Sequence, residues 1–146
     1  MQIPHNSYVL VADGKKSLFF RNEGDGDYPN LVVERKDGHA DQEDRELKTD
    51  DRGRTFSSAG DGRSAYEETD YHQQAEDRFA AETAEMLKER AMRQEFEQLI
   101  VVAPPRTLGE LRKHYHKEVE KRLAGELAKD LTSHPVEEIE KILSAA

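Results

Sequence analysis

Short runs of β-branched and aromatic residues, separated by turn residues, open the chain. The stretch YVLVADGKKSLFF contains two such runs on either side of Asp13 and Gly14. An Asp-Gly pair can take the positive φ angles of a tight hairpin turn, so the pattern predicts two antiparallel strands. The run LVVERK at 31–36 follows the turn residues of 23–30 and predicts a third strand. The chain is therefore expected to begin with a three-stranded meander.

The segment after this meander is polar. Between residues 37 and 51 the only large apolar residue is Leu47, so nothing there could anchor a buried helix and we expect a solvated stretch. The next segment, 52–63, is rich in Gly and Ser and carries one acid against three arginines, which are Arg52, Arg54 and Arg63. We predict a mobile loop over about 50–69 that is locally basic.

A helix is predicted after this loop. Asp70 and Gln73 have the spacing of a capping box, in which the Asp oxygen accepts an amide proton and the Gln reaches back, so the helix should start at Asp70. An apolar stripe about four turns long then recurs at three- and four-residue steps. It consists of Ala75, Phe79, Ala80, Thr83, Ala84, Met86, Leu87, Arg90 and Ala91.

A strand and a second helix should follow. The run FEQLIVVA at 96–103 is continuous and is ended by Pro104 and Pro105, as is typical of a central strand buried on both faces. Thr107 and Glu110 form a second capping box and predict a helix start. One side of this helix is marked by Leu108, Leu111, Tyr115, Val119 and Leu123.

The end of the chain is less regular. The helical period runs on to Leu131, but Gly125 weakens that extension, so the pattern leaves RLAGELA at 122–128 open between helix and strand. Pro135 suits the first position of a last helix, whose buried side would be Val136, Ile139, Ile142 and Leu143. Strands joined through packed helices make the expected fold class α/β, with a mixed β-sheet flanked by helices.

Length and charge narrow the classes of function. At 146 residues the chain is expected to form one domain, 1–146. A net charge of −9 repels phosphates at long range and argues against a general DNA-binding surface, so any RNA contact would be local. The longest apolar run, LIVVA, is too short to span a bilayer, and the first residues do not resemble a signal peptide. We therefore expect a cytoplasmic protein without a membrane partner.

Complete catalytic or metal-binding patterns are missing from the sequence. There are no cysteines, and the GDGD of 24–27 lacks the ligand series of a calcium loop. His114 and His116 would point about 200° apart on a helix, so one ion could not readily take both. No P-loop, dinucleotide fingerprint or nucleophile elbow occurs. The sequence thus predicts neither a metal nor a cofactor.

Two residues have alternative interpretations. Asp13 ends the first strand, where a two-metal nuclease would place its first carboxylate, but a turn role explains it equally well. His72 lies in the first turn of the acidic helix and could donate a proton near the loop, or it could be an ordinary exposed histidine.

Positive charge is concentrated in two places. One is the loop, whose glycines, serines and arginines suit a flexible arm that reaches phosphates, although a linker without a role would have a similar composition. The other is the helix that follows Pro105, because residues 106–122 carry six basic residues against three acids. Together the two segments supply the candidate RNA- or partner-binding residues, which are Arg52, Arg54, Arg63, Ser64, Arg106, Arg112, Lys113 and Lys117.

The segments LIVVAPPRTLGELRKHYHKEV and GELAKDLTSHPVEEIEKIL resemble the bacterial family described as "protein required for attachment to host cells", the host attachment proteins. The opening hairpin also resembles that family, so the resemblance covers nearly the whole chain. The family is in turn similar to the middle, catalytic domain of archaeal and eukaryotic class 1 peptide-chain release factors. The resemblance implies a bacterial archaeo-eukaryotic release factor-like domain with a ribonuclease H-like fold, in which RLAGELA is a strand.

The catalytic loop of those release factors carries Gly-Gly-Gln-Ser-Ala, whose Gln helps water attack the ester of peptidyl-tRNA. The similar position here reads Gly62, Arg63, Ser64 and Ala65. Arg is a cation that has donors and no acceptor, so it could hold a phosphate but could not orient a water through a carbonyl. The resemblance therefore favours binding near ribosomal RNA or tRNA over hydrolysis, with Arg63 as a candidate for either role.

Three functions stay open from the sequence. The first is a non-catalytic or weakly catalytic factor that binds ribosome or tRNA through the arginine-bearing loop and the basic helix. The second is a cytoplasmic interaction protein with another protein as its partner and an indirect role in attachment to host cells. The third is a hydrolase that uses Asp13 or His72. The oligomeric state is not predicted.

Overall fold

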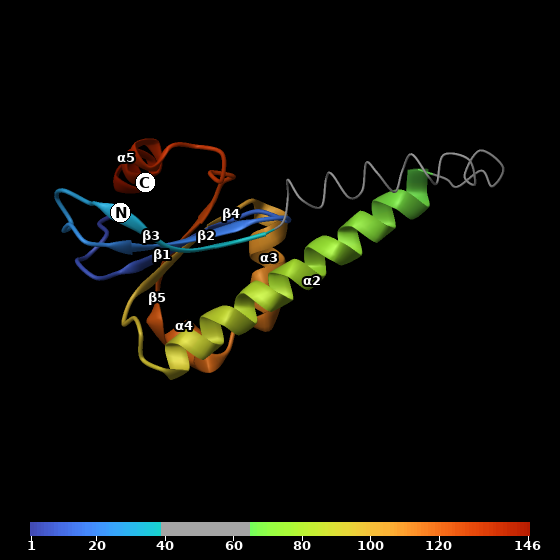
Figure 1. Cartoon of the computed structure of the whole chain (residues 1–146), viewed down its shortest axis with the longest axis horizontal. Helices are drawn as coiled ribbons and strands as arrows, with labels where there is room; N and C mark the ends of the chain where they lie inside the picture. Colours follow the sequence, from blue (N-terminus) through green and yellow to red (C-terminus); the bar gives the residue numbers. More distant parts are fainter. Residues whose placement is uncertain (39–64) are drawn as a thin grey trace.

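Five strands form a mixed sheet in the computed structural model, which describes the backbone of residues 1–38 and 65–146 and the side chains of 1–38 and 70–146 (Figure 1). Their order across the sheet is β3-β2-β1-β4-β5. The strands are β1 (Tyr8–Ala12), β2 (Ser17–Asn22), β3 (Leu31–Asp37), β4 (Leu99–Ala103) and β5 (Leu123–Ala128). The described helices are α2 (Ala65–Met92), α3 (Pro105–His114), α4 (Lys117–Arg122) and α5 (Val136–Ala145). The α/β class and the mixed sheet are as predicted.

The predicted hairpin is present, but its turn differs from the expected one. β1 and β2 pair antiparallel from Tyr8 opposite Arg21 to Ala12 opposite Ser17. Neither Asp13 nor Gly14 has a positive φ. Instead, Oδ1 of Asp13 accepts hydrogen bonds from the amides of Lys15 (2.7 Å) and Lys16 (2.8 Å). The Asp side chain therefore closes a longer loop by imitating a backbone turn.

The centre of the sheet is parallel and fully buried. β4 lies between β1 and β5 and runs parallel to both. All five residues of β1 and of β4 are buried, as predicted for a central strand, but β4 begins at Leu99, so residues 96–98 of the predicted strand are not part of it. Strands covered on both faces favour such continuous β-branched runs. RLAGELA is a strand from Leu123 onward, as the resemblance to release factors implied and as the helical period did not.

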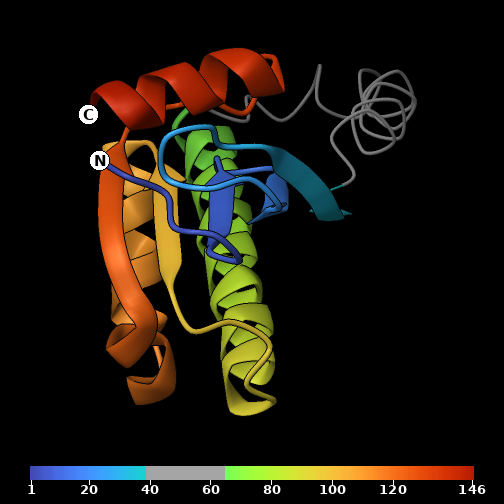
Figure 2. The same ribbon diagram turned by 90° about the vertical axis from the view of Figure 1, so that its left-hand side faces the viewer.

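Helices cover both faces of the sheet and create two separate cores (Figure 2). α2, α3 and α4 pack on one face, where the core includes Phe19, Leu87 and Leu111. α5 packs on the other face with Ile139 and Leu143. Burying each such side chain contributes roughly 1.5–3 kcal/mol, so both faces of the alternating strands contribute to stability. The described residues thus form one small α/β domain.

The start of α2 corrects two predictions. The helix begins at Ala65 instead of Asp70, so residues 65–69 are helical and do not belong to a loop. Asp70 lies inside the helix, and Nε2 of Gln73 donates to Oδ1 of Asp77 at 2.6 Å instead of reaching back to a cap. The pairing of Gln73 with Asp77, four residues later on the same helix face, competes with the capping box for the side chain of Gln73. The remainder of the predicted loop, 50–64, and the polar stretch from 39 lie outside the described residues.

The second predicted helix is shorter and broken. α3 begins at Pro105, with Pro104 as its N-cap and no side-chain cap, so the capping box at Thr107 is wrong. Tyr115 leaves the helix with ψ 129°, and α4 starts after His116. The Nδ1 atom of His116 accepts the amide of Glu118 at 3.0 Å, which caps α4 and makes the interruption stable.

The last helix agrees with the prediction to within one residue. α5 begins at Val136, and Pro135 is its N-cap instead of its first helical residue. Ile139 and Leu143 are buried, while Val136 and Ile142 pack partly buried at the edge of the same core. The amino group of Met1 donates to the carbonyl of Leu143 at 3.0 Å, so the two ends of the chain lie side by side (Figure 1). No helix in the described part of the chain is long and apolar enough to cross a membrane.

Candidate functional site

The segment that carries the loop arginines joins β3 to α2. Arg52, Arg54, Arg63 and Ser64 lie outside the described residues, so their predicted role is untested. The point where the chain leaves the sheet is well defined. Gly38 has a φ of +114°, and a Cβ placed on it would lie 2.5 Å from the carbonyl oxygen of Lys15. Gly38, directly after β3, is therefore in close contact with the β1–β2 turn.

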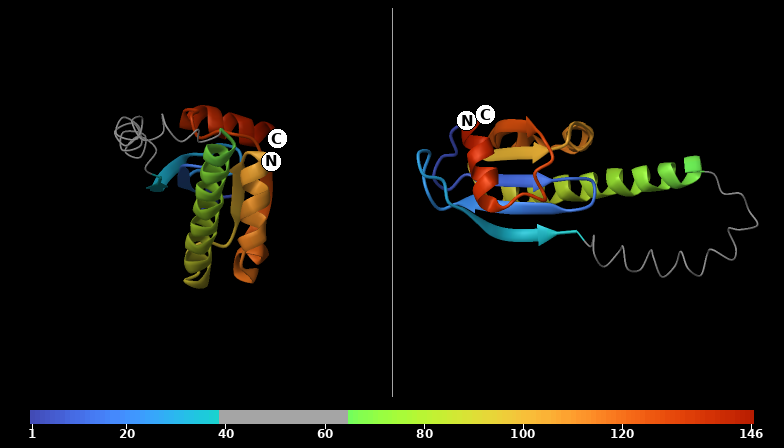
Figure 3. Two further views of the ribbon diagram at one scale, coloured as in Figure 1. Left: turned by 90° about the vertical axis from the view of Figure 1, so that its right-hand side faces the viewer. Right: turned by 90° about the horizontal axis from the view of Figure 1, so that it is seen from above.

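The other anchor of this segment is the amino-terminal half of α2. In Figures 1 and 3 the helix runs along the sheet and continues beyond it. Among the described side chains of α2, the first that is buried is that of Ala80. The helix from Ala65 to Glu76 spans about 16 Å at the helical rise. Arg63 and Ser64 thus directly precede a helix that meets the core several turns later.

Two of the three candidate catalytic residues, His72 and Asp13, lie in the described part of the chain. His72 is exposed on α2, with its ring centroid 6.1 Å from that of Tyr71. One turn later, Glu76 packs on the hairpin turn, since a Cβ on Gly14 would lie 2.5 Å from its Oε1. Asp13 belongs to that turn. In the described part of the chain, no hydrogen bond joins His72 to Asp13.

The contacts of Asp13 favour its turn role over a metal role. Its Oδ1 accepts two backbone amides, and its Oδ2 accepts the hydroxyl of Thr132 at 2.7 Å. The same hydroxyl lies 3.1 Å from Oδ1 of Asp130. A two-metal site needs several converging carboxylates. Among residues 1–38 and 70–146, no group of three or more His, Asp or Glu side chains could hold a metal ion.

The basic helix proves to be partly neutralised by its own neighbours. Arg112 donates to Glu126 on β5, with Nη2 2.9 Å from Oε1, and this bond raises the pKa of Arg112. Lys113 Nζ lies 3.0 Å from Oε2 of Glu110. Arg106 and Lys117 form no ion pair within the part of the chain that the structure describes. The available positive charge therefore lies at the first turns of α3 and α4.

Glu126 also contacts the partly buried phenol of Tyr115. The hydroxyl of Tyr115 donates to Oε2 of Glu126 at 3.3 Å. Burial raises the pKa of Tyr115 strongly, and the charge of Glu126 and this hydrogen bond raise it further. Tyr115 therefore stays a neutral donor. Its hydrogen bond to Glu126 joins the break between α3 and α4 to β5. Its role is structural.

α4 has its own set of charges. Glu118 accepts from Arg122 (2.8 Å) and Lys121 (3.2 Å), and these hydrogen bonds lower the pKa of its carboxyl. Arg122 also donates through Nε to the carbonyl of Phe96 at 2.9 Å. Both basic residues of the last turn of α4 are thus paired with Glu118, which leaves Lys117 as the phosphate-contact candidate on this helix.

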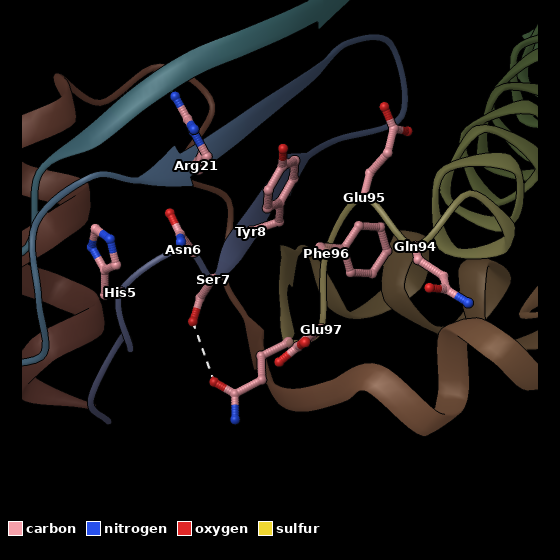
Figure 4. Close-up of a pocket in the computed structure, with 10 residues that line it drawn as sticks. His5, Asn6, Ser7, Tyr8, Arg21, Gln94, Glu95, Phe96 and Glu97 are labelled. Carbon is pink, nitrogen blue, oxygen red and sulfur yellow. Dashed lines mark hydrogen bonds between the residues drawn. The ribbon is translucent and has the colours of Figure 1, made fainter.

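A pocket that sequence reasoning did not predict lies at the end of the sheet opposite the hairpin turn (Figure 4). It has a volume of about 440 Å³ and is lined by residues 5–8, Arg21 and residues 94–98. Asn6 and Gln94, the two described non-glycine residues with positive φ, both line it. The three segments are far apart in sequence, and no spacing pattern connects them. The hairpin brings Arg21 beside Tyr8, and the pairing of β1 with β4, which the sequence did not predict, adds residues 94–98.

Comparison with known proteins supports the release-factor part of the resemblance. No curated protein matches the chain. A family model does match, over residues 6–143, which include the hairpin, α2 and the segment up to the last turn of α5. The resemblance to host attachment proteins stays a prediction. With nearly its whole length matched, the chain belongs to the family described as bacterial archaeo-eukaryotic release factor family 12.

Proposed function

We propose that this protein is a cytoplasmic, release-factor-like factor that binds phosphates of ribosomal RNA or tRNA and has little or no hydrolytic activity. The observation that carries the proposal is the family membership, combined with the order of elements around the loop. Gly62, Arg63 and Ser64 directly precede the start of α2 at Ala65, where release factors carry their catalytic motif. We take residues 1–146 as one functional domain.

The chemistry of Arg63 supports binding over catalysis. A guanidinium offers five donors in a planar fork, which matches the oxygens of a phosphate. A guanidinium has no acceptor, so it cannot accept a hydrogen bond from the attacking water, whereas the side-chain carbonyl of a Gln can. Because the described side chains of α2 are buried only from Ala80 onward, a partner could contact the arginine without disturbing the core.

The local charge of α3 and α4 also supports phosphate binding. The chain as a whole carries −9, so a polyanion is repelled unless positive charge is placed at the contact. Arg106 and Lys117 are the basic residues of 106–122 without an ion pair in the described part, whereas Arg112 and Lys113 face Glu126 and Glu110. Phosphate contact through the first pair requires no internal bond to break. We therefore assign the helical part of the interface to Arg106 and Lys117.

The test is sedimentation of the protein with ribosomes through a series of salt concentrations. The wild-type chain should travel with ribosomes at low salt and leave them as salt rises, because each phosphate contact releases counterions. Replacing Arg52, Arg54 and Arg63 with Ala should reduce the slope of log affinity against log salt by about 0.7–0.9 for each phosphate that the variant no longer neutralises. The double variant Arg106→Ala with Lys117→Ala should also reduce this slope.

Two controls make the result specific. Lys141→Ala removes one positive charge from an exposed position of α5, on the face of the sheet opposite α3 and α4. It should leave the slope unchanged. Arg112→Ala with Lys113→Ala should change it less than Arg106→Ala with Lys117→Ala. Wild-type protein that never sediments with ribosomes at low salt would refute the proposal. Rapid hydrolysis of peptidyl-tRNA by the wild-type protein, abolished in Arg63→Ala, would refute its non-catalytic part.

One observation favours a second function, an interaction with another protein that affects attachment to host cells indirectly. The amino-terminal half of α2 carries Asp70, Glu76 and Asp77 beside Tyr71, whose side chain is 64% exposed. Acidic charge repels phosphates, while an exposed aromatic suits a protein partner. Replacing Tyr71 with Ser should abolish partner capture in cell extract and leave ribosome sedimentation intact if this function is the correct one.

A further inference from the structure

The pocket at residues 5–8, Arg21 and 94–98 lies at the end of the sheet opposite Gly38, the last described residue before the loop. It opens where β1 and β4 begin and β2 ends, beside the residues that follow α2 (Figure 4). The loop leaves β3 at Gly38, next to the β1–β2 turn at the other end of the sheet. The pocket's volume of about 440 Å³ is in the lower part of the range for small-molecule sites.

Two backbone devices hold the walls of this pocket in place. α2 ends in a Schellman arrangement, in which the amide of Gln94 donates to the carbonyl of Ala91 (2.9 Å) and that of Glu95 to the carbonyl of Arg90 (3.0 Å). On the facing wall, the amide of Ser7 donates to the carbonyl of Pro4 at 3.1 Å, and Asn6 takes a φ of 64° between them. The pocket is thus formed before any ligand arrives.

Polar groups without strong partners face this space. Figure 4 shows the Tyr8 hydroxyl, Arg21 and the Glu95 carboxylate pointing to the same side. In the described part of the chain, the Tyr8 hydroxyl makes no hydrogen bond, and burial raises its pKa, so it stays a neutral phenol. The hydroxyl of Ser7 reaches Oε1 of Gln98 only at 3.4 Å. Hydroxyl and amide oxygens are therefore available as acceptors.

The unbalanced charge of the pocket is negative. Arg21 already faces two acids: its Nη2 donates to Glu23 at 2.7 Å, and its Nε lies 3.0 Å from Glu34 without forming a hydrogen bond to it. Glu95 has only a loose pair, at 3.9 Å from Arg93, and Glu97 has no ion pair within the described residues. The carboxyl end of α2, with its partial negative charge, also points here. An anion would meet two carboxylates and an arginine that is already paired.

We propose that this pocket binds a small alkylammonium compound. Its ammonium group would lie against the carboxylate of Glu95 and donate to the hydroxyl of Tyr8, which point to the same side in Figure 4, while Glu97 adds negative charge from the other side of the pocket. These acceptors match a group that has three donors and no acceptor. Such an ammonium could belong to a free diamine or to a lysine side chain of a polypeptide, which share this chemistry.

The test is a titration of the full chain followed by the NMR chemical shifts of its backbone amides. Putrescine represents the free amine, Nα-acetyl-lysine methylamide represents the peptide side chain, and inorganic phosphate represents an anion. Saturable shifts confined to residues 5–8, 21 and 94–98 with one or both amines, and none with phosphate, are expected. Tighter binding of putrescine indicates a free diamine, and tighter binding of the lysine compound indicates a polypeptide. No saturable shift with either amine, or equal shifts with phosphate, would overturn the assignment.

Variants at exposed positions then test the charges directly. Glu95→Gln and Glu97→Gln each keep the size and the hydrogen-bonding oxygen while removing the charge, and should raise the dissociation constant of the tighter amine about fivefold. Glu137→Gln makes the same change at an exposed position of α5 and should leave the dissociation constant unaltered. Spectra outside the pocket verify that each variant is folded. A dissociation constant that does not change in Glu95→Gln with Glu97→Gln combined would contradict the proposal.

Discussion

The hydroxyl of Thr132 donates a 2.7 Å hydrogen bond to Oδ2 of Asp13, across 119 positions of the chain. Asp13 follows the carboxyl end of β1, and Thr132 lies between β5 and α5. The other oxygen of Asp13 holds the amides of Lys15 and Lys16. One carboxylate thus closes the hairpin and joins it to the segment that leads into the last helix, which explains an Asp here without any catalytic role.

Removing the Thr132 hydroxyl should destabilise the domain. Thr132 is 7% exposed, and Thr132→Val keeps its shape while leaving Oδ2 of Asp13 without its donor. A hydrogen bond to a charged group contributes about 1.5–3 kcal/mol, and water can replace part of it because the carboxylate of Asp13 is only half-buried. We expect the free energy of unfolding, measured by urea denaturation, to fall by about 1–2 kcal/mol. Thr132→Ser retains the hydroxyl and should be clearly less destabilised; equal stability of Thr132→Val and wild type would show that the bond contributes nothing.

Asn22 is a second buried polar residue with a large structural role. It is 0% exposed at the end of β2. Its Nδ2 donates to the carbonyl of Ile3 at 2.6 Å, and its Oδ1 accepts the amides of Gly24 (3.0 Å) and Asn30 (2.8 Å). The side chain thereby fixes both the entry into β1 and the loop between β2 and β3.

Asn22→Ala should therefore cost about 2–3 kcal/mol, because three backbone groups lose their partner and the carbonyl of Ile3 is buried, while the amides of Gly24 and Asn30 are only partly buried. The measurement is the midpoint and slope of urea unfolding. Asn30→Ala makes the same chemical change at an exposed side chain and should shift the midpoint little. A small effect of Asn22→Ala, comparable with that of Asn30→Ala, would mean that water replaces these hydrogen bonds.

Asn22 also illustrates what the sequence could not predict. Nothing in the spacing of SLFFRN distinguishes a buried Asn from an exposed one, since its partners come from two loops that only the fold brings together. The pocket was missed for the same reason. By contrast, the hairpin, β4 and the buried side of α5 follow from local patterns of period 2 and 3.6, which depend on near neighbours alone.

The errors at helix ends have a shared physical cause. Both capping boxes have the correct spacing, yet neither caps a helix, because α2 and α3 begin five and two residues earlier. Pro105 can occupy a first helical turn without a cap, since its missing amide leaves one fewer donor to satisfy. The break at Tyr115 was hidden because Leu111, Tyr115 and Val119 keep a helical period. The strand at 123–128 came from the resemblance to release factors, because Gly125 alone could not decide between the two structures.

Replacing Gln94 with Gly should stabilise the protein. Gln94 has a φ of 59° at the end of α2, a conformation that costs a residue with a side chain about 1–2 kcal/mol and costs Gly nothing. The greater freedom of Gly in the unfolded chain offsets part of this, so a net gain of about 0.5–1 kcal/mol is expected by urea denaturation. Gln98→Gly, four residues on at an ordinary backbone angle, should instead be destabilising. A decrease in stability in Gln94→Gly would show that the side chain contributes more than the strain.

Tyr115 should make the protein sensitive to alkaline pH in a defined way. Burial, then the charge and hydrogen bond of Glu126, raise the pKa of its phenol above the ordinary value of 10.0. Below pH 10 the phenol is neutral in both folded and unfolded chains, so this group contributes its full stability; above it the unfolded phenol ionises first, and stability falls as pH rises. Tyrosinate absorbance should therefore include a late component that disappears in Tyr115→Phe and moves to lower pH in Glu126→Gln, which removes the charge. Tyr28→Phe, at a side chain 82% exposed, should remove only early absorbance. Because burial also raises the pKa of Tyr8, a second late component should survive in Tyr115→Phe, and a late signal of unchanged amplitude in that variant would contradict the assignment.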